Sequence, residues 1–306
     1  MRLCNKDALL MACAAALVLL PARQSPAQAV PVQAPSPMVL IPVSVTTPAL
    51  AMVTGLHEKD FQIYENKRLQ KIATFSKGDV PASIGILIDL SGSMSKSLPL
   101  IRESVLSFVK ASNPMDEFFV IGFSDRPELI ENFTSSVGDI EARLVTLSSG
   151  HRTALLDAIS YGIDKMKDAR HERKVLLVVS DGGENKSRTA DFEVRAQARR
   201  ASVEVFALGI FPPNAETPEE SLGPQLLSDL SEETGGRLLV ANKIDEMPSI
   251  AERVSAVLRM QYLIGYRSDN PIRDGKWRKV KVKVDPPPGL PPLTVHARTG
   301  YYAPLQ

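Results

Sequence analysis

The chain of 306 residues is poor in the side chains from which many catalytic and metal sites are built. It has two cysteines, four histidines and one tryptophan. Both cysteines, Cys4 and Cys13, lie near the N-terminus, so the sequence beyond them can form neither a disulfide nor a thiolate site. There is no excess of either charge, because 36 Lys and Arg face 35 Asp and Glu. Neither nucleic acid nor an anionic membrane is therefore indicated as a partner.

Long hydrophobic runs are also missing. The longest, from Ala8 to Leu20, is shorter than the roughly 20 residues that cross a bilayer. Basic residues precede it and a small-residue cleavage site, Ala27-Gln28-Ala29, follows it. We therefore expect a secretory signal over residues 1–29, a Pro-rich linker over 30–37, and an exported protein, periplasmic or extracellular, without a membrane span.

Apolar strand patterns alternate with amphipathic helix patterns between residues 82 and 260. Strands are expected at 84–88, 117–123, 174–179, 203–210 and 237–241. Helices are expected at 97–112, 153–169, 191–202, 222–233 and 244–260. Buried strands separated by such helices indicate an α/β fold with a doubly wound, mostly parallel sheet. Such sheets bind ligands at the carboxyl ends of their strands.

The flanking segments, 38–81 and 261–306, carry shorter strand patterns. The first has two strands around a polar turn at Glu65-Asn66-Lys67, and the second has strands expected at 261–267, 277–284 and 293–301. Neither segment has enough strands to be stable alone. We expect them to pack together as one small β-sandwich beside the α/β domain.

Oxygen-bearing side chains collect at the ends of the expected core strands. Asp89, Ser91 and Ser93 follow the first strand, Asp181 follows the strand at 174–179, and Thr153 begins a helix. Oxygen ligands without histidine or cysteine suit a hard cation such as Mg²⁺. Each residue also has a simpler explanation, because serine and threonine cap helices and Asp-Gly forms turns. Their expected convergence at one sheet edge favours a metal site.

These motifs resemble the metal-ion-dependent adhesion site of von Willebrand factor A (VWA) domains. The matching stretches are DLSGSMS at 89–95, RTALLDAI with Thr153, and VVSDGGEN with Asp181. The flanking stretches, among them DFQIYENKRLQKIATF and QYLIGYRSDN, resemble exported bacterial VWA-related proteins abundant in Acidobacteria. The resemblance covers nearly all of the chain after the signal and implies a Rossmann-like VWA domain over residues 82–260.

The resemblance also implies how the site works. Ser91, Ser93 and Thr153 would contact the ion directly, and Asp89 and Asp181 would hold it mainly through water. The ion would be Mg²⁺, with Mn²⁺ or Ca²⁺ as alternatives. A protein partner would complete the metal shell with an Asp or Glu side chain.

One departure from the family pattern concerns the rim of the site. His151 and Arg152 precede Thr153, where such proteins often carry a glycine. We expect these two side chains to line the rim and to influence which partner binds. Glu184 follows the Asp181 turn and is another candidate to approach the ion, although a solvated turn residue is the simpler interpretation.

An enzyme and a structural protein are the alternatives to a metal-dependent binding protein. Ser93-Met94-Ser95-Lys96, Ser268-Asp269-Asn270 and Arg298-Thr299-Gly300 imitate the three motifs of penicillin-recognising serine enzymes, but the second lies far from the first and close to the third. No nucleotide-binding glycine motif is present. We expect no enzymatic activity. The remaining alternative is a structural protein with a closed metal site, whereas a receptor site keeps one coordination position open.

Overall fold

The computed structural model describes residues 37–48, 51–211 and 217–305. The expected signal, 1–29, and nearly all of the expected linker lie outside the described residues. Those that are described all fall within one compact unit of the chain. None of the helices among them has the length and apolar character to cross a membrane.

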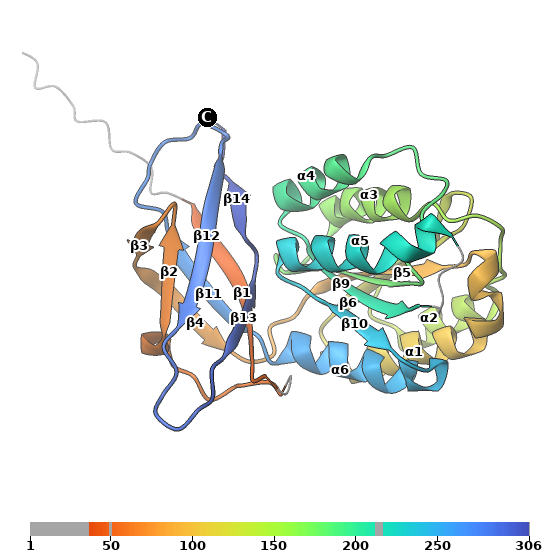
Figure 1. The fold of residues 1–306 in the computed structure, drawn as a ribbon, viewed down its shortest axis with the longest axis horizontal. Coiled ribbons are helices and arrows are strands. Elements are labelled where there is room, and N and C mark those ends of the chain that lie inside the picture. Colours follow the sequence, from red (N-terminus) through yellow and green to blue (C-terminus); the bar gives the residue numbers. More distant parts are fainter. Residues whose placement is uncertain (1–36, 49–50, 212–216, 306) are drawn as a thin grey trace, which may run out of the picture. The chain divides into compact units, whose positions relative to one another are not determined.

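The central sheet has six strands in the order β10-β9-β8-β5-β6-β7 (Figure 1). Their bounds are β5 (Ser83–Asp89), β6 (Glu117–Phe123), β7 (Pro127–Thr134), β8 (Lys174–Ser180), β9 (Glu204–Ile210) and β10 (Leu238–Ala241). All neighbours run parallel except β7, which is antiparallel to β6. The expected doubly wound, mostly parallel sheet is confirmed, and its carboxyl edge carries the ends of β5 and β8.

Helices cover both faces of this sheet (Figure 1). They are α1 (Leu98–Ala111), α2 (Val137–Val145), α3 (Leu155–Lys165), α4 (Asp191–Ala201), α5 (Pro218–Thr234) and α6 (Met247–Arg259). Apolar residues of α1, α2 and α6 share one core with the sheet, and those of α3, α4 and α5 share another. Burial on two faces explains why every residue of β5 is buried and why the residues between Ser83 and Asp89 are apolar.

The sequence patterns miss two of these elements, β7 and α2. The strand β7 lies at the edge of the sheet, none of its residues is fully buried, and Glu128 and Glu131 interrupt its apolar residues. The helix α2 is short and buries only Ile140 and Leu144. Both elements have too narrow an apolar face to stand out in the sequence.

The terminal segments form two four-stranded antiparallel sheets, ordered β13-β1-β11-β4 and β14-β12-β2-β3. Their strands are β1 (Met38–Thr46), β2 (Phe61–Glu65), β3 (Arg68–Gln70), β4 (Ile72–Lys77), β11 (Tyr262–Arg267), β12 (Trp277–Val284), β13 (Thr294–Ala297) and β14 (Gly300–Tyr302). Both sheets combine strands from the two ends of the chain, and their apolar side chains form one shared core.

The expectation of a single strand over 293–301 is wrong. The chain forms β13 and β14 there, and the two strands belong to different sheets. They are separated at Arg298, whose guanidinium donates a hydrogen bond to the Leu40 carbonyl oxygen at 2.6 Å. Arg298 and Leu40 are far apart in the sequence, so the residues around Arg298 give no sign of this contact.

Deleting residues 261–306 is expected to expose residues 38–80 to proteases. The deletion removes β11 from between β1 and β4, and it removes β12 from beside β2. Unpaired strands open easily, and protease cleavage follows such local opening. Limited proteolysis with mass spectrometry would compare the truncated and full chains, and equal protection of residues 38–80 in both would contradict the shared sheets.

Candidate metal site

The strand β5 ends at Asp89, whose side chain is fixed on both oxygens. The side chain is fully buried, Oδ1 accepts a hydrogen bond from the Ser91 backbone N–H at 2.9 Å, and Oδ2 accepts one from Ser180 Oγ at 2.6 Å. Ser180, at the end of β8, also accepts from the Gly182 N–H at 2.9 Å. Sequence reasoning missed Ser180, and its only signal was its place directly before Asp181.

Two serines, Ser91 and Ser93, follow Asp89. Ser91 directly precedes a tight 3-10 turn over Gly92–Ser97, and Ser93 lies within that turn. Ser91 is buried and Ser93 is exposed, and their hydroxyl oxygens lie 3.0 Å apart. Ser91 precedes the turn without a side-chain capping bond, and Ser97 precedes α1 in the same way. Because Ser91 and Ser97 hold the N-cap positions of this turn and of α1, the interpretation of Ser93 as a simple helix cap is wrong.

Thr153 and Asp181 face a common space beside Gly183. A Cβ atom placed on Gly183 would lie 3.2 Å from Asp181 Oδ1 and 3.5 Å from Thr153 Oγ1. Thr153 is buried and is not the N-cap of α3, because Ala154 holds that position. The turn interpretation of Asp181 does hold in part, since Oδ1 accepts the Gly183 N–H at 3.0 Å.

Backbone hydrogen bonds hold the three loops of the site together. The Gly150 N–H donates to the Leu90 carbonyl oxygen at 2.6 Å, which joins the loop before Thr153 to the loop after β5. The Asn185 side chain accepts the Thr153 N–H at 3.1 Å, which joins the same loop to the one after β8. The structure thus brings together the loops that carry all five predicted ligands. Their assignment as metal ligands stays a prediction.

The two carboxylates of the site lack a cationic partner. Burial, and secondly the charge of Asp181, raise the pKa of Asp89 to about 7. Among the described residues, neither Asp89 nor Asp181 forms an ion pair with a lysine, arginine or histidine. Two acidic side chains in a buried setting are stabilised by a positive charge that the neighbouring protein groups do not supply.

The rim of the site is open to solvent. His151 and Arg152 are exposed beside the buried Thr153, and Ser93 is exposed on the neighbouring loop. Glu184 is engaged elsewhere, since its Oε2 accepts the Leu156 N–H at 2.9 Å at the start of α3. Glu184 therefore stabilises the first turn of α3, a role that its sequence position did not reveal.

The three motifs that imitate a serine enzyme have separate roles. The Ser268 hydroxyl donates to Glu65 Oε1 at 2.7 Å, and Arg298 bonds to the backbone of β1. Within the described part of the chain, no hydrogen bond joins Ser93 to either of the other motifs. The geometry gives no support to an acyl-enzyme site.

Comparison with known proteins shows which folds this one is similar to. Residues 84–184 match the family model of the von Willebrand factor type A domain. A von Willebrand factor type A protein from Catenulispora acidiphila superposes with a TM-score of 0.52 at 11% identity, covering 87% of this chain and 74% of that one. No curated protein sequence matches significantly.

Two further solved structures share the fold. Proximal thread matrix protein 1 from the mussel byssus, with a zinc-occupied MIDAS motif, has a TM-score of 0.50 at 18% identity and covers 64% of this chain and 50% of that one. The pilus adhesin SpaC from Lactobacillus rhamnosus GG, in its open conformation, has a TM-score of 0.50 at 11% identity. The match covers 80% of this chain and 48% of that one. Residues 84–184 thus match the VWA family model, and the α/β part of the chain is similar in fold to these solved structures.

Proposed function

We propose that this VWA domain binds another protein through a divalent ion at the carboxyl edge of β5 and β8. An Asp or Glu side chain of the partner supplies the last ligand. The observation that carries the proposal is the pair Asp89 and Asp181, buried without a cationic partner beside the hydroxyls of Ser91 and Thr153.

The side chains at this edge fit a hard cation. They offer only oxygen atoms, which Mg²⁺ prefers and which Mn²⁺ and Ca²⁺ also accept. Ser91, Ser93 and Thr153 would hold the ion directly, and Asp89 and Asp181 would hold it through water. No group of three or more His, Cys, Asp or Glu side chains suited to a metal occurs in the described ranges, so hydroxyl ligands are needed to complete the shell.

The ligand set explains why an acidic partner is preferred. A bound dication attracts anions, and neutral hydroxyl ligands reduce its charge less than directly bound carboxylates do. Arg152, exposed at the rim, adds positive charge on the same side. A carboxylate arriving from solvent therefore gains more here than a neutral side chain.

An open site favours a receptor over a structural role or an enzyme. A structural metal site closes its coordination sphere with protein ligands, whereas Ser93, His151 and Arg152 are exposed here. In the mussel protein of the same fold, the MIDAS motif holds zinc. We include export to the periplasm or the outside in the proposal, so the partner is an envelope or extracellular protein, and the binding is non-catalytic.

Partner binding is expected to require the ion and the hydroxyl ligands. The partner would be captured from the native envelope fraction in Mg²⁺ and identified by mass spectrometry. With the purified partner, EDTA should abolish binding and Mn²⁺ or Mg²⁺ should restore it. Ser93→Ala or Thr153→Ala should each lower the affinity about tenfold or more, since each removes a ligand atom of the ion.

Ser95→Ala is the matched control. Its hydroxyl lies in the same turn and is exposed, but it has no expected contact with the ion. Its affinity for the partner should equal that of the unchanged chain. Capture that is indifferent to EDTA and to both ligand substitutions, Ser93→Ala and Thr153→Ala, would show that the protein binds by other means.

A further inference from the structure

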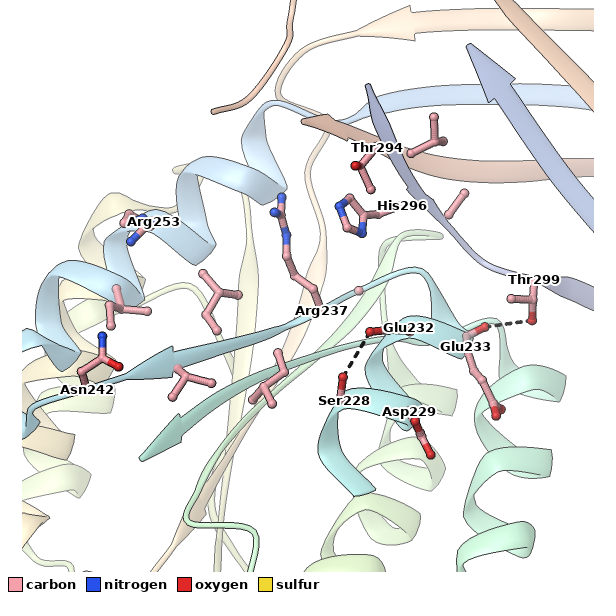
Figure 2. A pocket seen from close by; sticks show the side chains of 17 residues that line it. Ser228, Asp229, Glu232, Glu233, Arg237, Asn242, Arg253, Thr294, His296 and Thr299 are labelled. Atoms are coloured by element: carbon pink, nitrogen blue, oxygen red, sulfur yellow. Dashed lines mark hydrogen bonds between the residues drawn. The ribbon is translucent and has the colours of Figure 1, made fainter. Parts of the chain in front are cut away.

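A large cavity, separate from the metal edge, lies along the free edge of β10. Its volume is about 1070 Å³, and its walls come from α5, β10, α6 and β13 (Figure 2). None of its lining residues belongs to the candidate metal site. Because α5 and α6 pack on opposite faces of the central sheet, β10 forms the floor between two helical walls.

One side of this cavity carries the positive charges of Arg237 and Arg253, and the buried carboxylate of Glu204 attracts Arg237 without forming an ion pair with it. Arg237, just before β10, has its Nε buried without a hydrogen-bond partner among the described residues, and its Nη2 lies 3.3 Å from Met52 Sδ. Arg253 on α6 is exposed. In the described part of the chain, neither guanidinium forms an ion pair with a carboxylate.

The two arginines repel each other. Burial, and secondly the charge of Arg253, lower the pKa of Arg237. Figure 2 shows the Arg237 side chain extending from the start of β10 toward the side where His296 and Arg253 lie. The pKa of His296 is lowered as well, first by burial and then by Arg237. An anion placed beside the Arg237 guanidinium would relieve this repulsion.

The acids of the opposite wall do not supply that anion. Glu233 on α5 pairs with Arg195 at 2.8 Å and also with Arg199. Glu232 accepts a hydrogen bond from Ser228 Oγ at 3.1 Å (Figure 2). These carboxylates are held on the α5 side, so a negative group from outside is needed on the α6 side.

The strand edges beside the cavity favour an extended peptide as the source of this group. The strand β10 ends the six-stranded sheet, so only β9 pairs with it. Its Val240 side chain is 45% exposed, which is unusual for a strand of this sheet. An unpaired edge offers backbone N–H and C=O groups to an added strand, and side chains of that strand alternate between the two faces.

We propose that this cavity binds an extended acidic peptide segment, which pairs with the free edge of β10 and directs an Asp or Glu side chain to Arg237 and Arg253. Alternation brings every second side chain of the peptide to the α6 side, where the arginines lie. This site is independent of the divalent ion. It gives the protein a second binding surface, selective for acidic strands.

The probe is a fluorescein-labelled hexapeptide of alternating Thr and Glu, with an alternating Thr and Gln peptide as its neutral match. Fluorescence anisotropy with the mature chain should show saturable binding of the Thr/Glu peptide. The neutral peptide should bind about tenfold more weakly, because it cannot form charged hydrogen bonds to the arginines. Binding should be unchanged in EDTA and in Asp89→Ala, which separates this site from the metal site.

Arg237→Gln and Arg253→Gln should each weaken the Thr/Glu peptide about tenfold. Lys281→Gln, which removes an exposed positive charge from β12, is the control and should have no effect. Hydrogen exchange should slow at Leu238–Ala241 when the peptide is bound. Equal binding of the two peptides, full binding by both arginine variants, or unchanged exchange at β10 under saturation would each overturn the proposal.

Discussion

Asp89→Asn and Asp181→Asn are each expected to abolish the binding of Mg²⁺ while the fold is retained. The unchanged chain should show one site by isothermal titration calorimetry, and the variants should show none. Mg²⁺ at about 100 times its dissociation constant should add about 2.7 kcal/mol to the free energy of unfolding of the unchanged chain. It should add nothing to that of either variant, because each loses one of the two carboxylates that are proposed to hold the ion.

Asparagine is chosen because it keeps the local hydrogen bonds. At position 89 the amide oxygen can still accept the Ser91 N–H, and its NH₂ group can donate to Ser180 Oγ. At position 181 the amide oxygen can still accept the Gly183 N–H. Without Mg²⁺ the variants should be no less stable than the unchanged chain, since repulsion between the two buried carboxylates is removed.

Asp168→Asn is the control for a general loss of charge. Asp168 is exposed and pairs with Lys165 at 2.8 Å. This variant should bind Mg²⁺ as the unchanged chain does. Undiminished Mg²⁺ binding by both site variants would remove the metal site, and with it the basis of the proposed function.

Glu65→Ala is expected to destabilise the terminal sheets by about 3–5 kcal/mol. Glu65 lies at the end of β2 and is 2% exposed. Its carboxylate accepts hydrogen bonds from Tyr266 and Tyr301 at 2.8 Å each and from Ser268 at 2.7 Å, and it pairs with Arg278 at 3.3 Å. Alanine would leave three hydroxyls without this acceptor, and it would leave the buried Arg278 guanidinium with the Asn270 and Ile272 carbonyl oxygens and Asp274 but without its buried carboxylate partner.

This cluster connects strands of both sheets. Tyr266 belongs to β11, in one sheet, while Glu65, Arg278 and Tyr301 belong to the other. Burial and secondly the hydrogen bond to Glu65 raise the pKa of Tyr301 to about 12, so it stays protonated as a donor at neutral pH. The loss of stability in Glu65→Ala should therefore affect both sheets together.

Denaturant unfolding followed by Trp277 fluorescence measures this effect. Trp277 is the single tryptophan of the chain and lies on β12, so its signal reports the terminal sheets. Glu58→Ala, at an exposed position of the same segment, should change the free energy of unfolding by about 0.5 kcal/mol or less. A loss of less than about 1 kcal/mol in Glu65→Ala would mean that the cluster does not hold the sheets together.

Much of the fold follows from local sequence patterns. The apolar runs of β5, β6, β8 and β9 can be identified from the sequence, because strands covered on both faces are almost continuously apolar between their ends. Each expected helix has an amphipathic pattern, which is likewise contained within one segment of the sequence. The predicted metal motif is also partly local, since Asp89 is the last residue of β5 and Asp181 directly follows β8.

Contacts between distant residues were decided only by the tertiary structure. The bond from Ser180 to Asp89 and the cluster around Glu65 depend on which strands become neighbours, and no spacing in the sequence encodes that. The break between β13 and β14 has the same cause. So does the pair Arg237 and Arg253, because two positive charges from different elements meet only after β10 and α6 have packed. The hydrophobic periodicity of a segment shows which of its faces is buried. Which strands pair, and which charges meet at a site, depend on residues that are close in space but distant in the sequence.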